Sequence, residues 1–555
     1  ATQGGNTIDL GLGDDVVRFT TATNQDTVTV ASDTVSGNKT VVYESSATGA
    51  KIFTGSGNDS IVFQAALSGV NSIQTGSGND SVRFLDAASG VTVFDLGAGV
   101  DYVTAANIFQ NGLVSGGAGA DTFVIATLSN AAIYGGDDRD SVNITGSLFG
   151  ATVDFGAGDE LFSLTVNATT STVSGGAGND TFLFGTVGTF TSSLIDGGVG
   201  NDSITFGGTL TSATTVSGGA GDDSLTFASP VVSAVVLGGA DAGSDLLVFS
   251  STVSAAAVNA DAGNDTVRLL SNVFGSTIDL ADGADYLSFT STLATSTVLG
   301  GNNNDTFIFG ASAVFQTSSI SGGDNDDSLV FSAVVNSGTT VAAGGGNDFL
   351  SFATSVSNAV ISAASGNDNV VFNALVTGST VWGGGTAAAQ TMVFGSAADT
   401  LTFSGGFGAG FISLGAGADT IEFVGAAVSG TTLTGLTTSG DRVSLLGTNT
   451  MVFGTDGIAD GAVVSFGANN DMATFSGAVG ATTLYAGGGA DTLVFASGQN
   501  VTGTTLMGLA TSGDRAFLLG NNTVVFGTDG IATGAQVSFG GNNDMATFSG
   551  AVGAA

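Results

Sequence analysis

The chain has 555 residues, of which 90 are Gly, one is Pro and none is Cys or His, and only 10% are charged. Its net charge of −39 comes almost wholly from Asp, and this sign excludes nucleic acid as a partner. A hydrophobic content of 42%, with 38 Phe, is too high for a disordered chain. Gly, Asp, Asn and Ser interrupt every apolar stretch, so no run of about 18 apolar residues is available for a transmembrane helix.

The first residues, 1–50, are predicted to form variant coils at the N-terminus. They contain one glycine- and aspartate-rich turn, LGLGDDVVRF at 10–19, and Lys39, one of the two lysines of the chain; the other, Lys51, follows directly. After this turn the Gly-Asp pattern is lost, but β-branched residues still alternate at 27–30. This alternation is typical of a strand with one buried face.

Residues 51–433 repeat a unit of about twenty residues. Its signature appears as GSGNDSIVF at 55–63, GGAGNDTFLF at 175–184 and GGVGNDSITF at 197–206, and a marker aspartate recurs once in each unit. After each aspartate, apolar residues occupy every second position, as in Phe182 and Phe184. A period of two predicts a short strand with these side chains in the core.

A second strand is expected shortly before each Gly pair, where Ser/Thr/Ala-rich stretches end in residues such as Val173 and Ile195. Neither strand can bury its apolar face alone, so successive coils must stack in parallel, about 4.8 Å apart. The predicted fold is therefore all-β: a parallel β-solenoid (β-roll or β-helix) with two short strands per coil. No sustained 3.6-residue period is present, so no helix longer than about two turns is expected.

The C-terminal part, 434–555, contains a duplication. The segment 438–481 returns nearly intact as 511–554, each residue of the copy standing seventy-three positions after its counterpart. Between the consecutive markers Asp441 and Asp471 the spacing is about half as long again as in the regular repeats. This predicts longer coils with an extra turn in a third part of the solenoid, and the chain is also irregular near 386–398.

The GGxGxD unit resembles the haemolysin-type (RTX) calcium-binding repeat, in which ions lie between stacked turns of a β-roll. That family has two nonapeptides per coil and ions along both edges, whereas this chain has one Gly-Asp turn per coil. A single calcium column is therefore expected, with a metal-free opposite edge. The Phe- and Asp-rich, low-complexity style is also similar to cyanobacterial surface fibril (oscillin-like) and surface-layer proteins.

A physical argument for metal stands beside the resemblance. Stacked turns would place one carboxylate above another, and like charges at that spacing repel unless cations intervene. Ca²⁺ takes six to eight oxygen ligands, while zinc and copper prefer the His and Cys that this chain lacks. The alternative is that Gly-Asn-Asp only builds turns. The expected ligands are Asp15, Asp59, Asp80, Asp101, Asp121, Asp140, Asp180, Asp202, Asp223, Asp245, Asp265, Asp285, Asp305, Asp327, Asp348, Asp368, Asp419, Asp471, Asp491 and Asp544.

These patterns favour an extracellular structural protein over an enzyme, because His and Cys are absent and the carboxylates are committed to turns. The predicted role is a calcium-stabilised fibril, sheath or surface layer at a bacterial cell surface, with a link to motility or adhesion. Expected partners are other copies of the chain, stacked head to tail or laterally, and cell-surface polysaccharide. Two alternatives stay open: the repeat region of a secreted RTX-type adhesin, toxin or enzyme, and a flat Ser/Thr-rich face for ice or glycan.

Overall fold

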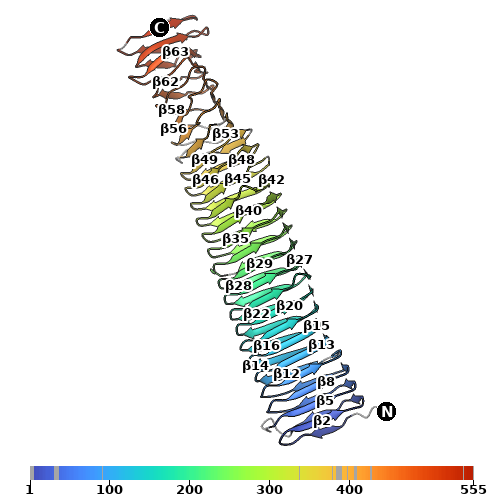
Figure 1. Cartoon of the computed structure of the whole chain (residues 1–555). Coiled ribbons are helices and arrows are strands. Elements are labelled where there is room, and N and C mark those ends of the chain that lie inside the picture. The colour runs from blue at the N-terminus through green and yellow to red at the C-terminus, as the bar shows by residue number, and fades with distance from the viewer. Residues whose placement is uncertain are drawn as a thin grey trace. The chain divides into compact units, whose positions relative to one another are not determined.

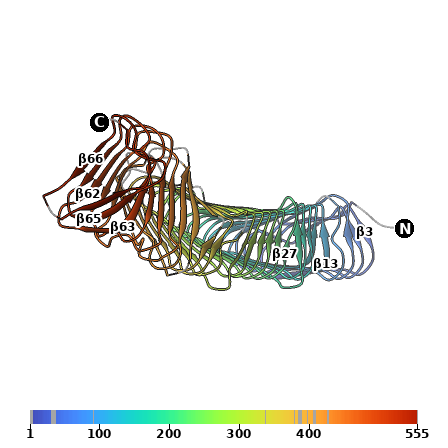
Figure 2. The ribbon, with the colours of Figure 1, turned by 90° about the horizontal axis from the view of Figure 1, so that it is seen from above.

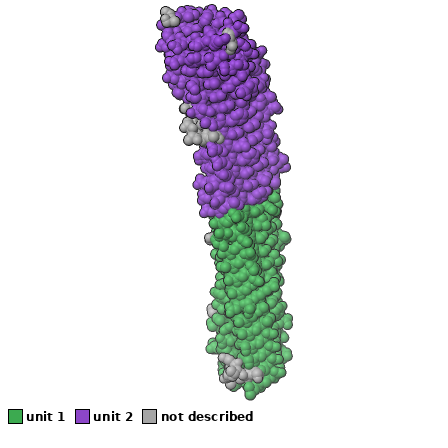
Figure 3. Space-filling view, turned by 90° about the vertical axis from the view of Figure 1, so that its left-hand side faces the viewer, with its two compact units in different colours: residues 1–281 green, residues 282–555 purple. Residues whose placement is uncertain are grey.

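The computed structural model describes residues 5–30, 37–90, 92–239, 241–336, 338–377, 379–382, 390–396, 398–404, 409–424, 428–541 and 543–553. These residues form strands and turns, with no helix among them. The chain divides into two compact units, 1–281 and 282–555 (Figure 3). No helix in the described part of the chain is long and apolar enough to cross a membrane.

In the first unit, two series of strands alternate along the chain (Figure 1). The sheet A strands are β2 (Asp15–Phe19), β5 (Lys39–Tyr43), β8 (Ser60–Phe63), β11 (Ser81–Phe84), β13 (Tyr102–Gln110), β15 (Thr122–Ser129), β17 (Ser141–Ile144), β20 (Leu161–Leu164), β23 (Thr181–Phe184), β26 (Ser203–Phe206), β29 (Ser224–Phe227), β32 (Leu246–Phe249) and β35 (Thr266–Leu269). The sheet B strands are β1 (Thr7–Asp9), β4 (Thr27–Thr29), β7 (Lys51–Phe53), β10 (Asn71–Gln74), β12 (Thr92–Ala98), β14 (Gly112–Ala118), β16 (Ala132–Asp137), β19 (Thr152–Ala157), β22 (Thr172–Ala177), β25 (Leu194–Val199), β28 (Thr215–Ala220), β31 (Val235–Gly239), β34 (Ala257–Asp261) and β37 (Thr277–Asp279).

The second unit is built in the same way. Its sheet A strands are β38 (Tyr286–Phe289), β41 (Thr306–Phe309), β44 (Ser328–Phe331), β46 (Phe349–Phe352), β49 (Asn369–Phe372), β52 (Thr391–Phe394), β54 (Phe411–Ser413), β56 (Ser429–Thr434), β58 (Thr450–Phe453), β60 (Met472–Phe475), β62 (Thr492–Phe495), β64 (Arg515–Leu518) and β66 (Gln536–Phe539). Its sheet B strands are β40 (Thr297–Asn302), β43 (Ser319–Asp324), β45 (Thr340–Gly345), β48 (Val360–Ser365), β51 (Ser379–Trp382), β53 (Thr400–Ser404), β55 (Thr420–Val424), β57 (Arg442–Leu445), β59 (Val463–Phe466), β61 (Thr483–Tyr485), β63 (Asn500–Met507), β65 (Asn521–Phe526) and β67 (Met545–Phe548).

The parallel solenoid with two strands per coil is confirmed. Each main strand pairs in parallel with the strand one coil away, so that Thr181 lies opposite Ser203 and Thr172 opposite Leu194. Many coils add a short strand between sheets A and B, which the sequence pattern did not indicate. These short strands are β3 (Thr23–Asn24), β6 (Ala47–Thr48), β9 (Leu67–Ser68), β18 (Leu148–Phe149), β21 (Ala168–Thr169), β24 (Thr189–Thr191), β27 (Thr209–Leu210), β30 (Val231–Val232), β33 (Val253–Ser254), β36 (Val273–Phe274), β39 (Thr292–Ala294), β42 (Val314–Gln316), β47 (Val356–Ser357) and β50 (Val376–Thr377).

The core lies between the two sheets, and Figure 2 shows the coils from above. Phe182 and Phe184 are buried while Leu183 between them is exposed, as the alternation predicted. The closing Phe of one coil stacks on that of the next: the rings of Phe184 and Phe206 are 4.3 Å apart and inclined by 3°. This aromatic row gives most coils the same large apolar anchor.

The prediction of longer coils in the C-terminal part is wrong. Arg442 lies opposite Val463, and Thr450 lies opposite Met472, so these coils have the same length as the others. The wide spacing between Asp441 and Asp471 has a different cause: Asp441 precedes the sheet B strand β57, whereas Asp471 precedes the sheet A strand β60. The aspartates change sides while the coil length stays constant.

Candidate cation sites in the aspartate turns

The GGxGxD turns connect each sheet B strand to the next sheet A strand, which we call the B-to-A edge. The marker aspartate is the last residue before the sheet A strand, as Asp180 is before β23. Its side chain points into the coil and is almost inaccessible: Asp121 is 1% exposed and Asp140 is 0% exposed. The turn residue before Asp180, Asn179, is exposed. The structure therefore buries a carboxylate at each of these turns.

In most coils, one carboxylate oxygen of the marker aspartate has a clear role. Oδ1 accepts a hydrogen bond from the backbone N–H of the marker residue one coil earlier, at 2.6 to 2.9 Å. Asp101, for example, accepts from the N–H of Asp80 at 2.7 Å. We call this series the aspartate ladder. In the first unit its acceptors are Asp59, Asp80, Asp101, Asp121, Asp140, Asp180, Asp202, Asp223, Asp245 and Asp265, and in the second unit they include Asp305, Asp327, Asp348 and Asp368.

The other oxygen, Oδ2, is buried without a hydrogen-bond partner in most of these turns. A buried carboxylate oxygen without a donor costs more free energy than an ordinary hydrogen bond contributes. A role in turn formation alone explains the hydrogen bond of Oδ1 but not the burial of Oδ2 without a partner. Unpartnered Oδ2 atoms belong to Asp59, Asp80, Asp101, Asp121, Asp140, Asp180, Asp202, Asp223, Asp305, Asp327, Asp348, Asp368, Asp399, Asp419, Asp471 and Asp491.

Oxygen atoms crowd around the turn glycines. A Cβ added to Gly175 would collide with Oδ2 of Asp180 and with the carbonyl oxygen of Gly197 in the following coil. The same collision occurs at Gly218 with Asp223. Glycine is required here because a carboxylate oxygen and a carbonyl oxygen approach the backbone closely from two coils. Oxygen atoms gathered from two successive turns, among them an Oδ2 without a donor, are the ligand type that hard cations prefer.

Burial disfavours the charged form of these carboxylates. It raises the pKa of Asp80 to about 7, with the neighbouring Asp101 and Asp59 adding to the rise and the N–H of Asp59 opposing it. Burial likewise raises the pKa of Asp305 to about 8. Near neutral pH these turns therefore hold carboxylates that take up either a proton or a cation.

Two marker positions were missed by the sequence analysis. Glu160 occupies the position between Asp140 and Asp180, and its N–H donates to Asp180 at 2.8 Å. Burial, then the adjacent Asp180, raise the pKa of Glu160 to about 9. Asp399 precedes β53 and has an unpartnered Oδ2. Both are followed by the usual alternation, LFSL and TLTF, which could have revealed them. Before Glu160 both glycines of the GxGxD pattern are present and only the aspartate is replaced, whereas before Asp399 the second glycine is missing.

In the second unit the ladder changes edges. Asp399 and Asp419 precede sheet B strands, so they lie where the chain passes from sheet A to sheet B, which we call the A-to-B edge. Their ladder continues to Asp441, which accepts from the N–H of Asp419 at 2.9 Å. Asn449, Asp471, Asp491 and Asp514 then form a ladder on the B-to-A edge, and Asn522 and Asp544 form one on the A-to-B edge. The prediction that marker aspartates occupy one edge holds up to Asp368 and is wrong beyond it.

Two aspartates that follow the sequence TSG are satisfied without any ion. Asp441 Oδ2 accepts from the N–H of Thr438 at 3.0 Å, and Asp514 Oδ2 accepts from the N–H of Thr511 at 2.8 Å. No group of three or more His, Cys, Asp or Glu side chains converges among the described residues. A cation in one of the other turns would therefore depend on backbone carbonyls for most of its ligands.

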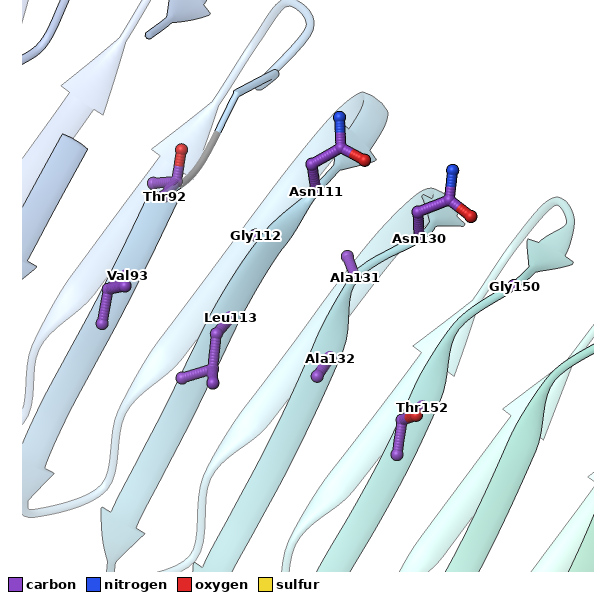
Figure 4. A pocket seen from close by; sticks show the side chains of 10 residues that line it. All are labelled: Thr92, Val93, Asn111, Gly112, Leu113, Asn130, Ala131, Ala132, Gly150 and Thr152. Carbon is purple, nitrogen blue, oxygen red and sulfur yellow. The ribbon is translucent and has the colours of Figure 1, made fainter. Parts of the chain in front are cut away.

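A shallow depression over the sheet B strands β12, β14, β16 and β19 is a different feature (Figure 4). The residues that line it, among them Asn111, Asn130 and Thr152, are all uncharged. It therefore offers no ligand set comparable to the aspartate turns.

Comparisons with known proteins assign no family to the chain. No protein-family model matches the chain, and no curated protein does. Among solved structures, a hyperactive, Ca²⁺-dependent, β-helical antifreeze protein from an Antarctic bacterium aligns with 17% identity and a TM-score of 0.22, over 64% of this chain and 79% of its own. The PL6 family alginate lyase AlyGC aligns with 10% identity and a TM-score of 0.21, over 99% and 97%.

Proposed function

We propose that this chain is a calcium-stabilised structural solenoid of an extracellular surface. The observation that carries the proposal is the row of buried Oδ2 atoms without hydrogen-bond partners. Many nearly identical turns present the same unmet requirement for a positive group. A structural cation satisfies it once per coil and links one coil to the next.

A cation satisfies these turns better than protons do. Protonation would neutralise Asp202, whose pKa burial raises to about 7, but only for part of the molecules at neutral pH. A proton also serves only one oxygen, whereas the turn gathers a carboxylate and carbonyls from two coils. A divalent ion contacts several of them together and offsets the repulsion between successive carboxylates.

Calcium is the ion that fits the donor set. The chain has no His and no Cys, so nitrogen and sulfur ligands are absent. In the turn of Asp180 the ligands would be its carboxylate and the carbonyls of glycines in its own coil and in the next, such as Gly197. Each site has one or two carboxylates, which predicts the modest affinity of extracellular modules, about 10⁻⁴ to 10⁻³ M.

Asp223 and Asp222 offer a matched test. Asp223 is a buried ladder residue with an unpartnered Oδ2, while its exposed neighbour Asp222 accepts only from the N–H of Ser244 at 2.7 Å. Both D223N and D222N remove one charge and keep an acceptor oxygen. Calorimetry in calcium should show one site fewer for D223N and an unchanged number for D222N. Equal calcium uptake by D223N and the wild type, or none by the wild type at millimolar calcium, would contradict the proposal.

The proposed setting is an assembled fibril, sheath or layer outside a bacterial cell. It is supported by the uniform repeat architecture, which extends one apolar core coil by coil. Sedimentation and negative-stain microscopy in millimolar calcium test it: we expect polymers or sheets that disperse on chelation. A population that stays monomeric at high protein concentration would exclude self-assembly while leaving the calcium sites intact.

A further inference from the structure

We infer that Lys39 is a built-in replacement for the cation of the first aspartate turn, and that Gln390 partly fills the turn of Asp368. The inference rests on the proposed cation sites and names two turns that differ from them. Lys39 stands at a ladder position: it pairs with Asp15 in the preceding coil, and its N–H donates to Asp59 Oδ1 at 2.6 Å. The backbone is therefore that of any other coil, and only the side chain differs.

The Lys39 side chain reaches back into the turn of the preceding coil. Its Nζ donates to the carbonyl oxygen of Gly11 at 3.0 Å, to that of Gly13, and to Asp15 Oδ2 at 2.8 Å. The side chain is 0% exposed, so the ammonium is buried in this turn. An ammonium has three donors and no acceptor, and here all three find oxygens. Gly11, Gly13 and Asp15 are the Gly-x-Gly-x-Asp positions of the repeat.

This contact shows which oxygens a positive group meets in such a turn. The turn that contains Gly55, Gly57 and Asp59 has the same pattern, but the next ladder residue is Asp80, which supplies a second carboxylate instead of an ammonium. Asp59 Oδ2 then lacks a partner, whereas Asp15 Oδ2 has one. The turn of Asp15, which the sequence analysis assigned to calcium, therefore needs no ion because Lys39 already occupies it.

Gln390 repeats the arrangement in the second unit with a neutral group. It stands one coil after Asp368, since the next residue, Thr391, lies opposite Asn369. Its buried Nε2 donates to the carbonyl oxygen of Gly366 at 2.8 Å. Asp368 Oδ2 keeps no hydrogen bond of ordinary geometry. The Gln390 side chain nevertheless opposes the rise in the pKa of Asp368 that burial causes, so the neutral amide stabilises this carboxylate only in part. Beyond Gln390 the ladder moves to the other edge at Asp399.

The two replacements predict where calcium dependence begins. Hydrogen exchange of the whole chain, followed by mass spectrometry with calcium or with chelator, should show unchanged protection of β2 in the wild type. Protection of the interior strands β26 and β29 should fall at least tenfold on chelation. K39D would place a carboxylate at the ladder position, so β2 should then be protected in calcium and exposed in chelator.

K39M and K39R separate the charge from the space that the side chain fills. K39M keeps most of the length without the charge, and β2 should lose at least tenfold protection with or without calcium. K39R keeps a cation and should retain protection in both conditions. Unchanged protection of β2 in K39M, or a calcium-independent K39D, would overturn the role given to Lys39.

The same experiment separates this inference from the proposed function. If chelator does not change the protection of the interior strands, the proposed cation sites are wrong, whatever the result for Lys39. If chelator lowers the protection of the interior strands and of β2 in the wild type equally, the proposed cation sites are supported, and the proposal that Lys39 replaces a cation is wrong. For the second unit, Q390D should raise the number of bound calcium ions by one, and Q390M should leave it unchanged. A Q390D protein with the wild-type number would overturn the role given to Gln390.

Discussion

The coils from residue 51 to 372 and those from 390 to 553 have the same length and the same stacked sheets, yet they place their aspartates differently. Within each unit, the first group keeps every ladder residue on the B-to-A edge. The second group moves the ladder from one edge to the other and back. The spacing of the aspartates along the sequence and the length of a coil are therefore separate properties. An aspartate fixes a turn, but it does not fix which edge the turn occupies.

The duplicated segment shows this most clearly. Arg442 and Arg515 are equivalent residues of the two copies, and one coil after Arg442 the chain has reached Val463. About three and a half coils of this length fit between the two arginines, so Arg442 begins a sheet B strand and Arg515 begins a sheet A strand. The local contacts are the same in both copies: Thr438 donates to Asp441 as Thr511 donates to Asp514. Nearly identical sequences thus form the same turn on opposite edges.

Calcium removal should have the largest effect and should separate the two groups of coils. When the free calcium concentration is ten times the dissociation constant, one site adds about 1.4 kcal/mol to the free energy of unfolding, and these contributions sum over many coils. Strands β23 to β29 lie between turns with unpartnered carboxylates, whereas β57 and β64 follow Asp441 and Asp514, which are satisfied internally. Hydrogen exchange in chelator should therefore open β23 to β29 first. Simultaneous opening of β57 and β64 would mean that their turns also bind ions.

Acidification without calcium should stabilise the first group of coils. The folded pKa values of Asp121 and Asp223 are raised to about 7, above their unfolded values, so folding binds protons near neutral pH. This contribution is fully present below about pH 4 and is lost as the pH rises through 7. The melting temperature in chelator should therefore fall as the pH rises from 5 to 8. In saturating calcium the fall should be much smaller; equal slopes in both conditions would contradict this expectation.

Removing one ring of the aromatic row should destabilise both groups of coils equally. Phe206 stacks between Phe184 and Phe227, and Phe475 stacks between Phe453 and Phe495. Substituting either by Ala removes a fully buried ring and should cost about 3 to 5 kcal/mol. Denaturant titration of F206A and F475A should give similar losses with calcium present or absent. A loss confined to F206A would show that the core, and not only the turns, differs between the two groups.

Asp419 and Asp441 lie one coil apart in the ladder, and their substitutions should depend on calcium differently: the effect of D419N should change sign between chelator and calcium, whereas that of D441N should stay the same. D419N removes a buried charge with an unpartnered oxygen, so it should stabilise the protein in chelator and weaken it in calcium. D441N should cost about 1 to 3 kcal/mol in both conditions, because the new amide no longer accepts from the N–H of Thr438. Thermal melts of the two variants, with and without calcium, measure the contrast. Parallel shifts would show that the two carboxylates have the same environment.

A labelling experiment tests the coil length with little effect on stability. The chain has no Cys, so pairs of engineered cysteines can carry pyrene without background. Ser444 lies opposite Ser465, one coil away, so S444C with S465C should give excimer fluorescence. Coils as long as the spacing from Asp441 to Asp471 would instead bring position 444 next to position 474. Excimer fluorescence from S444C with T474C, and none from S444C with S465C, would support the longer coils instead.

Much of the fold could be predicted from the sequence because the apolar period and the Gly-Asp turns are both local signals. Phe184 and Asp180 are recognisable from their neighbours alone. The edge occupied by Asp399 is not local, since it depends on how much chain separates it from the previous turn in space. The contact of Lys39 with Gly11 and Gly13 spans a whole coil, and no pattern within one repeat records it. Sequence reasoning therefore recovered the repeat unit and missed the exceptions.

The half-coil offset of the duplicated segment also bears on how such a gene can grow. The TSGD turn forms on either edge. An insertion of half a coil therefore keeps the alternation of inward and outward side chains along each strand, as an insertion of a whole coil does. Unequal recombination between the two copies would add or delete one length of the duplication and leave every apolar side chain pointing inward. What changes is the side on which all later loops are displayed. Each added copy would therefore turn the coils that follow it by half a coil while the core stays the same.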